Sequence, residues 1–362
     1  SFINKRIKLI MAYTTINKSS DYFNNKIYTG NGSTQSITGV GFQPDWVWFK
    51  NRSSSNNNRL FDVVRGAGKN LVSNTNGAEI NAGTGTDGQL RTFDSDGFSV
   101  GSDGSVNHNG QNIVAWNWKA GGGQGSSNTD GSINTTYTSV NTTAGFSISK
   151  YTGTGSAGAT VGHGLGVAPK MIIAKGLTYA DVWIVGGDNL GGWNKEMYLN
   201  STSAVATNNN AFNGVAPTSS VFTLGSGNGT NKSGDTYIAY CFAEKQGYSK
   251  FGSYAGNGNA DGTFVYTGFK PAWIMTKQTN GSDWWVINDT KRDTFNASTL
   301  GIRPNDTAAE SSDSAWTKDI LSNGFKQKTA NGGSNGSGNT YIYMAFAEAP
   351  LVGTNNIPAN AR

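Results

Sequence analysis

The chain has 362 residues, of which 14% are charged, and a formal net charge of +5. This small excess of cations gives no reason to expect binding to nucleic acid, and no run of 18 apolar residues is present to span a membrane. The single cysteine, Cys241, excludes an intrachain disulfide, and we expect its side chain to be buried. Fifty glycines with ten tryptophans, 14 tyrosines and 17 phenylalanines favour an all-β chain of short strands and polar turns.

Residues 1–19 are predicted to form an N-terminal arm. Its first ten residues are basic, and the segment from Met11 to Thr15 resembles a natural start. Our hypothesis is that Met11 is the initiator and that residues 1–10 are a translated leader or an extension. The intact mass of the native protein tests this, because a mass that includes residues 1–10 contradicts it.

One strand pattern occurs three times. In each copy a proline is followed by apolar residues and by a lysine six positions later; the copies are Gly41 to Lys50, Leu165 to Lys175 and Thr267 to Lys277. Trp46 and Trp48 alternate with Val47 and Phe49, so both faces of the run are apolar. Such a strand is covered on both sides, and proline is tolerated where it stands first in the strand. We therefore expect a core strand of a repeated β domain.

Further markers follow the same register. A tyrosine and a glycine-rich cluster precede each proline, and an apolar strand closes each copy; the tyrosines are Tyr28, Tyr151 and Tyr254. A repeat near 100 residues predicts three antiparallel β-sandwiches. Their predicted bounds are 20–122, 145–246 and 247–349, with a Gly/Ser/Asn linker at 123–144 and a C-terminal tail at 350–362.

Acidic glycine-rich turns occur in the first repeat, where Asp94 and Asp96 precede Gly97, and Asp103 precedes Gly104. Two β-turns are the first interpretation, since Asp-Gly suits the positive-φ position. A calcium site of Asp94, Asp96 and Asp103 is the alternative, but no glutamate follows at the twelfth position of an EF-hand loop. We expect no cofactor and no other metal site.

Catalytic constellations are not apparent. His108 and His163 lie in different polar loops without metal-ligand spacing, and we expect both to be exposed. Glu244 and Glu348 occupy equivalent positions in two repeats, so they suit salt bridges or turns better than a glycosidase pair. Exposed tryptophan rings can stack on sugars. We expect most tryptophans to pack in the core, and Trp193 and Trp316 are the two candidates for glycan binding.

The segments Gly41 to Lys50, Arg59 to Gly66 and Phe93 to Phe98, with the ending Ala345 to Gly353, resemble a repeat domain of virion proteins of tailed bacteriophages, common in marine phages. The likeness extends over residues 11–362. It implies a concanavalin A-like lectin jelly roll and a structural or host-recognition role, and it supplies no catalytic residues.

From these observations we expect a non-enzymatic virion protein, made in the bacterial host cytoplasm, that acts as a tail fibre or surface appendage and contacts host-cell glycans. Its partners would be other virion proteins and further copies of itself, with a homotrimer as one form. One alternative is a capsid-decorating, knob-like protein without receptor binding. The other is a polysaccharide depolymerase, which needs two carboxylates in one groove.

Overall fold

A computed structural model describes residues 13–353. The fold is all-β and every strand pairing within the sheets is antiparallel, which confirms the predicted class. Residues 1–12 of the predicted arm, with Met11, and residues 354–362 of the predicted tail lie outside the described residues. None of the helices in the described part is long and apolar enough to cross a membrane.

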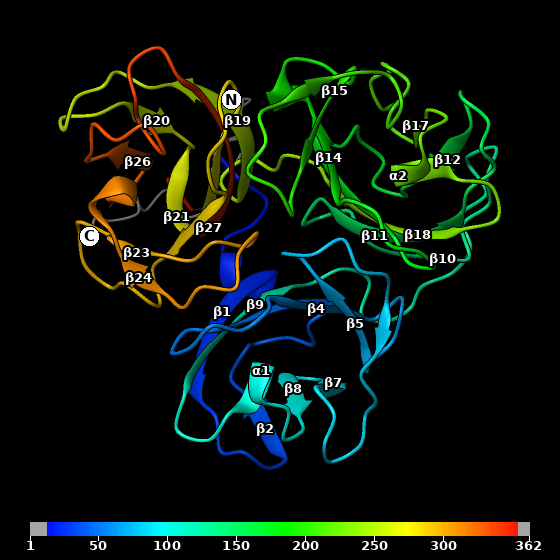
Figure 1. The fold of residues 1–362 in the computed structure, drawn as a ribbon, viewed down its shortest axis with the longest axis horizontal. Coiled ribbons are helices and arrows are strands. Elements are labelled where there is room, and N and C mark those ends of the chain that lie inside the picture. Colours follow the sequence, from blue (N-terminus) through cyan, green and yellow to red (C-terminus); the bar gives the residue numbers. More distant parts are fainter. Residues whose placement is uncertain (1–12, 354–362) are drawn as a thin grey trace, which may run out of the picture.

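The chain forms three units, which lie around a common centre (Figure 1). Unit 1 begins after the short helix η1 (Ser19–Asp21) and has a six-stranded main sheet and a three-stranded small sheet. In spatial order the main sheet contains β1 (Phe23–Thr29), β9 (Asn112–Trp118), β3 (Trp46–Asn51), β4 (Arg59–Asp62), β5 (Lys69–Val72) and β6 (Ile80–Asn81). The small sheet contains β2 (Gln35–Thr38), β8 (Gly97–Val100) and β7 (Leu90–Asp94), and helix α1 (Gly104–Asn107) follows it in sequence.

Unit 2 repeats this order with one strand added at the sheet edge. Its main sheet contains β10 (Tyr137–Asn141), β11 (Phe146–Thr152), β18 (Thr236–Phe242), β13 (Met171–Gly176), β14 (Ile184–Gly187), β15 (Lys195–Tyr198) and β16 (Ala206–Thr207). Its small sheet is β12 (Thr160–Gly162) with β17 (Val221–Thr223), and its helices are η2 (Asp188–Leu190) and α2 (Asn228–Asn231).

Unit 3 has the same central strands in a shorter sheet. The main sheet contains β19 (Ser249–Ala255), β27 (Thr340–Pro350), β21 (Phe269–Gln278) and β22 (Val286–Asp289). The small sheet contains β20 (Phe264–Tyr266), β26 (Gly324–Gln327) and β25 (Lys318–Leu321). A strand pair β23 (Leu300–Gly301) and β24 (Ser311–Ser312) and helix η3 (Ser314–Trp316) complete it.

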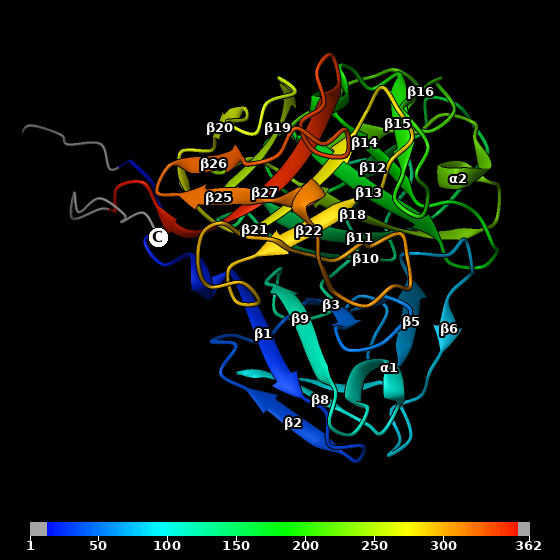
Figure 2. The same cartoon turned by 60° about the vertical axis from the view of Figure 1, so that its left-hand side comes forward.

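Each main sheet is buried on both faces, as the alternating sequence predicts. Val47 and Phe49 pack into an outer core with the small sheet of unit 1, whereas Trp46 and Trp48 enter a central core that all three units share. The same alternation places Ile173 in the central core. Figures 1 and 2 show the small sheets on the outside of the molecule. The repeated strand is therefore a wall between two cores.

Proline precedes the repeated strand in only two units. Pro44 and Pro169 precede β3 and β13, but Pro271 lies inside β21, which begins at Phe269. The expectation of a first position is wrong for Pro271, and the register shifts beside it show how the strand tolerates the missing N–H.

Hydrogen bonds of one kind close the three units into a ring. The backbone N–H groups of Glu79, Val205 and Glu310 donate to carbonyl oxygens two residues beyond the repeated lysines, over 2.9, 2.8 and 3.1 Å; the acceptors are Leu177, Thr279 and Arg52. Each bond joins a unit to the next, and the third returns to the first. The chain therefore contains an approximate threefold arrangement within itself.

The predicted linker and arm are in contact with these units where they are described. Strand β10 lies within residues 123–144, and Ile133 is buried and bridges to Val161. In the arm, Ile16 is 1% exposed and joins the central core, while Tyr13 donates its hydroxyl to the Gly268 carbonyl at 2.7 Å. Apolar side chains inside these polar segments account for their packing.

Candidate functional site

A polar cavity of about 190 Å³ lies in unit 2, between the outer face of the main sheet and the loops around α2. We call it the acidic pocket because two carboxylates line it, Asp181 and Glu196. Its lining is formed by Asp181, Val182, Ile184, Glu196, Tyr198, Asn210, Ala211 and the run Gly227 to Gly229.

Strand β15 places Glu196 in the pocket by simple alternation. Met197 enters the central core, so its neighbours Glu196 and Tyr198 face the other side of the sheet. Glu196 is 5% exposed, and its Oε1 accepts hydrogen bonds from the Tyr198 hydroxyl at 2.9 Å and Asn208 Nδ2 at 2.8 Å. Its Oε2 is shielded from solvent and has no donor among the described residues. A buried carboxylate oxygen without a donor is costly, so it is a site where a ligand or water would be stabilised.

Asp181 is held at the pocket by local contacts. Its Oδ1 accepts the Val182 N–H at 2.7 Å, and its Oδ2 accepts the Tyr179 hydroxyl at 3.2 Å. Burial raises the pKa of Tyr198 to about 12, with added contributions from the hydrogen bond to Glu196 and the negative charges of Glu196 and Asp181. The two carboxylates thus give the pocket a negative potential, and this potential favours the neutral form of Tyr198.

The two carboxylates form no direct ion pair among the described residues, although the charge of Asp181 acts on the buried Lys175, whose pKa burial lowers and Asp181 raises. Neither Asp181 nor Glu196 belongs to an ion pair formed within residues 13–353. Lys232 lies over the Tyr179 ring at 4.4 Å, but its ammonium is bound to Asp235 at 2.6 Å.

Close backbone packing forms the opposite wall. A Cβ on Gly229 would lie 2.9 Å from Ile184 Cγ1, and one on Gly227 would lie 2.7 Å from the Asn210 carbonyl oxygen. The glycines therefore let the loop approach the sheet. Exposed Asn210 and Asn228 then bring polar groups to the rim.

The other units differ at the position of Glu196. Met197, which follows Glu196, pairs with the second residue of β14, and Leu71 and Ile302 pair in the same way with the second residues of β4 and β22. The residues equivalent to Glu196 are therefore Asn70 in unit 1 and Gly301 in unit 3. In unit 3 a Cβ on Gly301 would lie 2.2 Å from Trp316 Cε3, so the indole fills this space. The pair of carboxylates belongs to unit 2 alone among the three.

The two tryptophans chosen from the sequence are not exposed. Trp193 is 4% exposed, packs edge-on against Phe212 and donates its Nε1–H to Asp188 Oδ1 at 2.6 Å. Trp316 is 5% exposed. The expectation of exposed rings for sugar stacking is therefore corrected: both rings are buried in the interior of their units, although Trp193 stands between Gly192 and Asn194 in the sequence.

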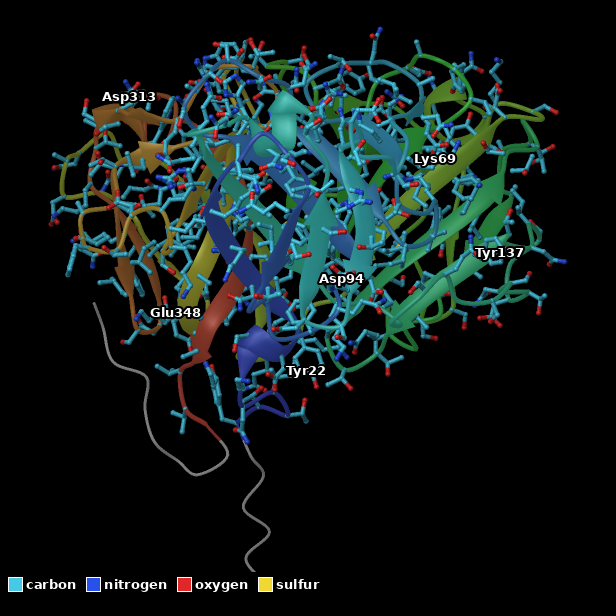
Figure 3. All side chains as sticks on the ribbon, turned by 90° about the horizontal axis from the view of Figure 1, so that it is seen from below. Tyr22, Lys69, Asp94, Tyr137, Asp313 and Glu348 are labelled. Atoms are coloured by element: carbon cyan, nitrogen blue, oxygen red, sulfur yellow. The ribbon has the colours of Figure 1, made fainter. Side chains whose placement is uncertain are left out.

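The acids of the candidate calcium loop serve separate local roles. Asp96 accepts the backbone N–H groups of Gly39 and Gly41 at 2.9 and 2.7 Å, and Asp103 caps α1 through the Ser105 N–H. Asp94 lies on the outer surface of unit 1 (Figure 3). Within the described residues no three side chains of His, Cys, Asp or Glu gather as metal ligands. The turn at Asp96 and Gly97 is as expected, but Asp103 begins a short helix rather than a second β-turn.

Histidine exposure is predicted correctly for only one residue. His108 is exposed, but His163 is 0% exposed, and burial lowers its pKa. Its Nδ1 accepts the Leu165 N–H at 3.1 Å, which explains how a polar loop can bury an imidazole. The predicted salt bridges are confirmed, since Glu244 contacts Lys250 and Glu348 contacts Lys270, each at 2.8 Å.

Comparison with known families shows a match to a family described as a domain of unknown function (DUF7483), over residues 18–350. The chain belongs to this family. No curated protein matches, and no solved structure matches. This DUF7483 chain therefore has its three units within one family domain, and the family description assigns no activity.

Sequence reasoning missed Asp181 and Glu196 in this family member. They are 15 residues apart, with Asp181 in the loop before β14 and Glu196 in β15. The sequence does not show that both face the same side of the sheet, or that neither forms an ion pair among the described residues. β15 has only four residues, Lys195–Tyr198, and no apolar alternation within it marks Glu196 as buried.

Proposed function

We propose that this DUF7483 chain is a structural protein of a bacteriophage particle, a tail fibre or surface appendage that contacts host-cell glycans without catalysis. Its repeats resemble a domain of phage virion proteins, and the proposed jelly-roll units would hold the glycan. It would be made in the host cytoplasm and would act on the particle with other virion proteins. Association of several copies would multiply its sites and raise avidity.

The observation that carries the glycan contact is the acidic pocket with its unpartnered Glu196 oxygen. Sugar hydroxyls are donors, and the Asn210 and Asn228 side chains at the rim can donate to and accept from them. A cavity of about 190 Å³ with few converging polar groups suits a small group better than an extended surface.

Binding to host cells and to an array of surface glycans tests this proposal. We expect specific binding by the full chain and at least tenfold weaker binding by Glu196→Gln, which keeps the shape of the side chain but removes its charge. Glu244→Gln is the matched control, because it makes the same change at a partly exposed ion pair of unit 2. Equal binding by both variants would contradict the site; no binding by the full chain would contradict the glycan contact and favour a capsid-decorating role.

A polysaccharide depolymerase is the second candidate, since Asp181 and Glu196 line one pocket. Glycoside hydrolysis uses two carboxylates about 5 to 9.5 Å apart as acid and as base or nucleophile. Release of reducing ends from host polysaccharide, lost in both Asp181→Asn and Glu196→Gln, would support this role. Binding without release would support the non-enzymatic proposal.

A further inference from the structure

We infer that the acidic pocket selects a ligand that carries a protonated amine beside hydroxyl groups, such as an amino sugar whose amine is not acetylated. This inference rests on the proposed glycan contact and names the class of glycan.

The charge of the pocket is the first step. Glu196 and Asp181 bring two carboxylates to one small cavity, and neither forms an ion pair within the described residues. Glu196 is 5% exposed, so water screens its charge only weakly. A neutral sugar leaves the charge of Glu196 without a counterion, whereas an ammonium group supplies one and forms charge-assisted hydrogen bonds.

The hydrogen bonds of Glu196 are the second step. Its Oε1 already accepts from Tyr198 and Asn208, and its Oε2 accepts from no described residue. An ammonium carries three donors and no acceptor, so it matches an acceptor-only carboxylate better than a hydroxyl, which brings an acceptor as well. Oε2 is shielded from solvent, so this contact requires the carboxylate to rotate toward the cavity.

The comparison between units is the third step. Unit 1 has Asn70 at the Glu196 position and Arg59 at the position of Ile184, and unit 3 fills the space with Trp316. Burial lowers the pKa of Arg59, while the charge of Asp103 raises it. A cation therefore lies at the corresponding place in unit 1, and the negative charge in unit 2 is not a general property of the repeat.

Binding of three methyl glycosides to the full chain tests the inference. The probes are methyl glucosaminide, methyl N-acetylglucosaminide and methyl glucoside, compared by calorimetry or saturation-transfer NMR at pH 6. We expect the free amine to bind at least tenfold more tightly than the two neutral sugars. Glu196→Gln and Asp181→Asn should each reduce this preference severalfold, and Glu244→Gln should retain it.

The outcomes separate the two proposals. Equal binding of the three sugars, reduced alike in Glu196→Gln, would overturn the selection of an amine and leave the glycan contact standing. No binding of any probe, together with no binding to host cells or the glycan array, would overturn both. Thermal unfolding of each variant shows whether it is folded, and Asp181→Asn gives a second test if Glu196→Gln unfolds.

Discussion

Four lysines are buried completely, a rare position for this side chain. Lys50, Lys175 and Lys277 are the repeated lysines, and Lys318 is the fourth. The ammonium groups of the first three bind backbone carbonyls, for example Lys50 with Thr307 of another unit at 2.8 Å. Burial lowers the pKa of each of the three to about 8 and that of Lys318 to about 7. In the folded chain, water no longer stabilises the positive charge of these four ammonium groups.

Stability should therefore rise with pH above neutrality. Between about pH 7 and the ordinary lysine pKa near 10.5, the unfolded chain binds more protons at Lys318 than the folded chain. The free energy of unfolding then increases by up to about 1.4 kcal/mol per pH unit from this residue, and the gain is absent below pH 7. We expect Lys318→Met to flatten the curve, measured by urea unfolding at pH 7 and pH 9.5. A parallel shift of both curves would contradict this assignment.

At the residue scale the sequence predicts apolar burial better than polar burial. It placed Cys241 and the strand tryptophans in the interior correctly. It did not show that His163, Glu196 and the repeated lysines are buried, because polar residue types in polar surroundings do not reveal which backbone and side-chain groups will satisfy them inside the fold.

At the scale of elements, two contacts between units share a polar network that the third lacks. Asp62 pairs with Arg65, and Asp289 with Arg292, all without exposed side chain. The acids also accept from the next unit around the ring: Asp62 from the Tyr240 hydroxyl at 2.7 Å and Asp289 from Trp116 Nε1 at 2.9 Å.

In the third contact every equivalent position is apolar. Register pairs make Gly187 the equivalent of Asp62 and Asp289, and Met344 the equivalent of Trp116 and Tyr240. Leu190 then stands at the arginine position. Replacement of all partners together avoids an unpaired buried charge, which a single replacement would leave.

We expect Arg292→Met to cost about 3–5 kcal/mol, because Asp289 stays buried without its counterion. Lys250→Met is the control, since it removes a cation from the partly exposed pair with Glu244 and should cost about 1 kcal/mol or less. Denaturant midpoints at unchanged m-value measure both. Similar losses in the two variants would contradict the role of the buried pair.

Predicted elements are most accurate where one pattern decides them. The alternation in Gly41 to Lys50 gives the strand and both of its faces. The short strands β15 and β16 and the helices α1 and α2 depend on contacts between loops and sheets, so the sequence does not show them. The acidic pocket is lined by residues of β15 and α2, and for this reason its parts were not foreseen as a site.

At the scale of the whole molecule, an approximate threefold arrangement is present within one chain, whereas the sequence led us to expect one between chains. The central core contains side chains from all three units, including Trp48, Ile173 and Trp273. A single unit would expose this face of its main sheet to water.

The described chain should accordingly unfold as one cooperative body. Calorimetry of the full chain should give equal calorimetric and van 't Hoff enthalpies, and a fragment of residues 123–246 should show no cooperative transition. Three separate transitions, or a stable fragment, would contradict the shared core and favour independent domains.

Ring closure also determines when the units can pack together during protein synthesis. The bond from the Glu310 N–H reaches Arg52, and the Arg52 side chain reaches Glu310 across 258 residues of sequence. At about 5–20 residues per second, a ribosome needs about 10–50 s to add that length. During this interval the face of unit 1 that carries Trp46 and Trp48 is not yet covered by the complete units 2 and 3. The nascent chain therefore needs protection from aggregation. Protease digestion of stalled chains should therefore find unit 1 sensitive at 250 residues and protected only in the released, full-length protein.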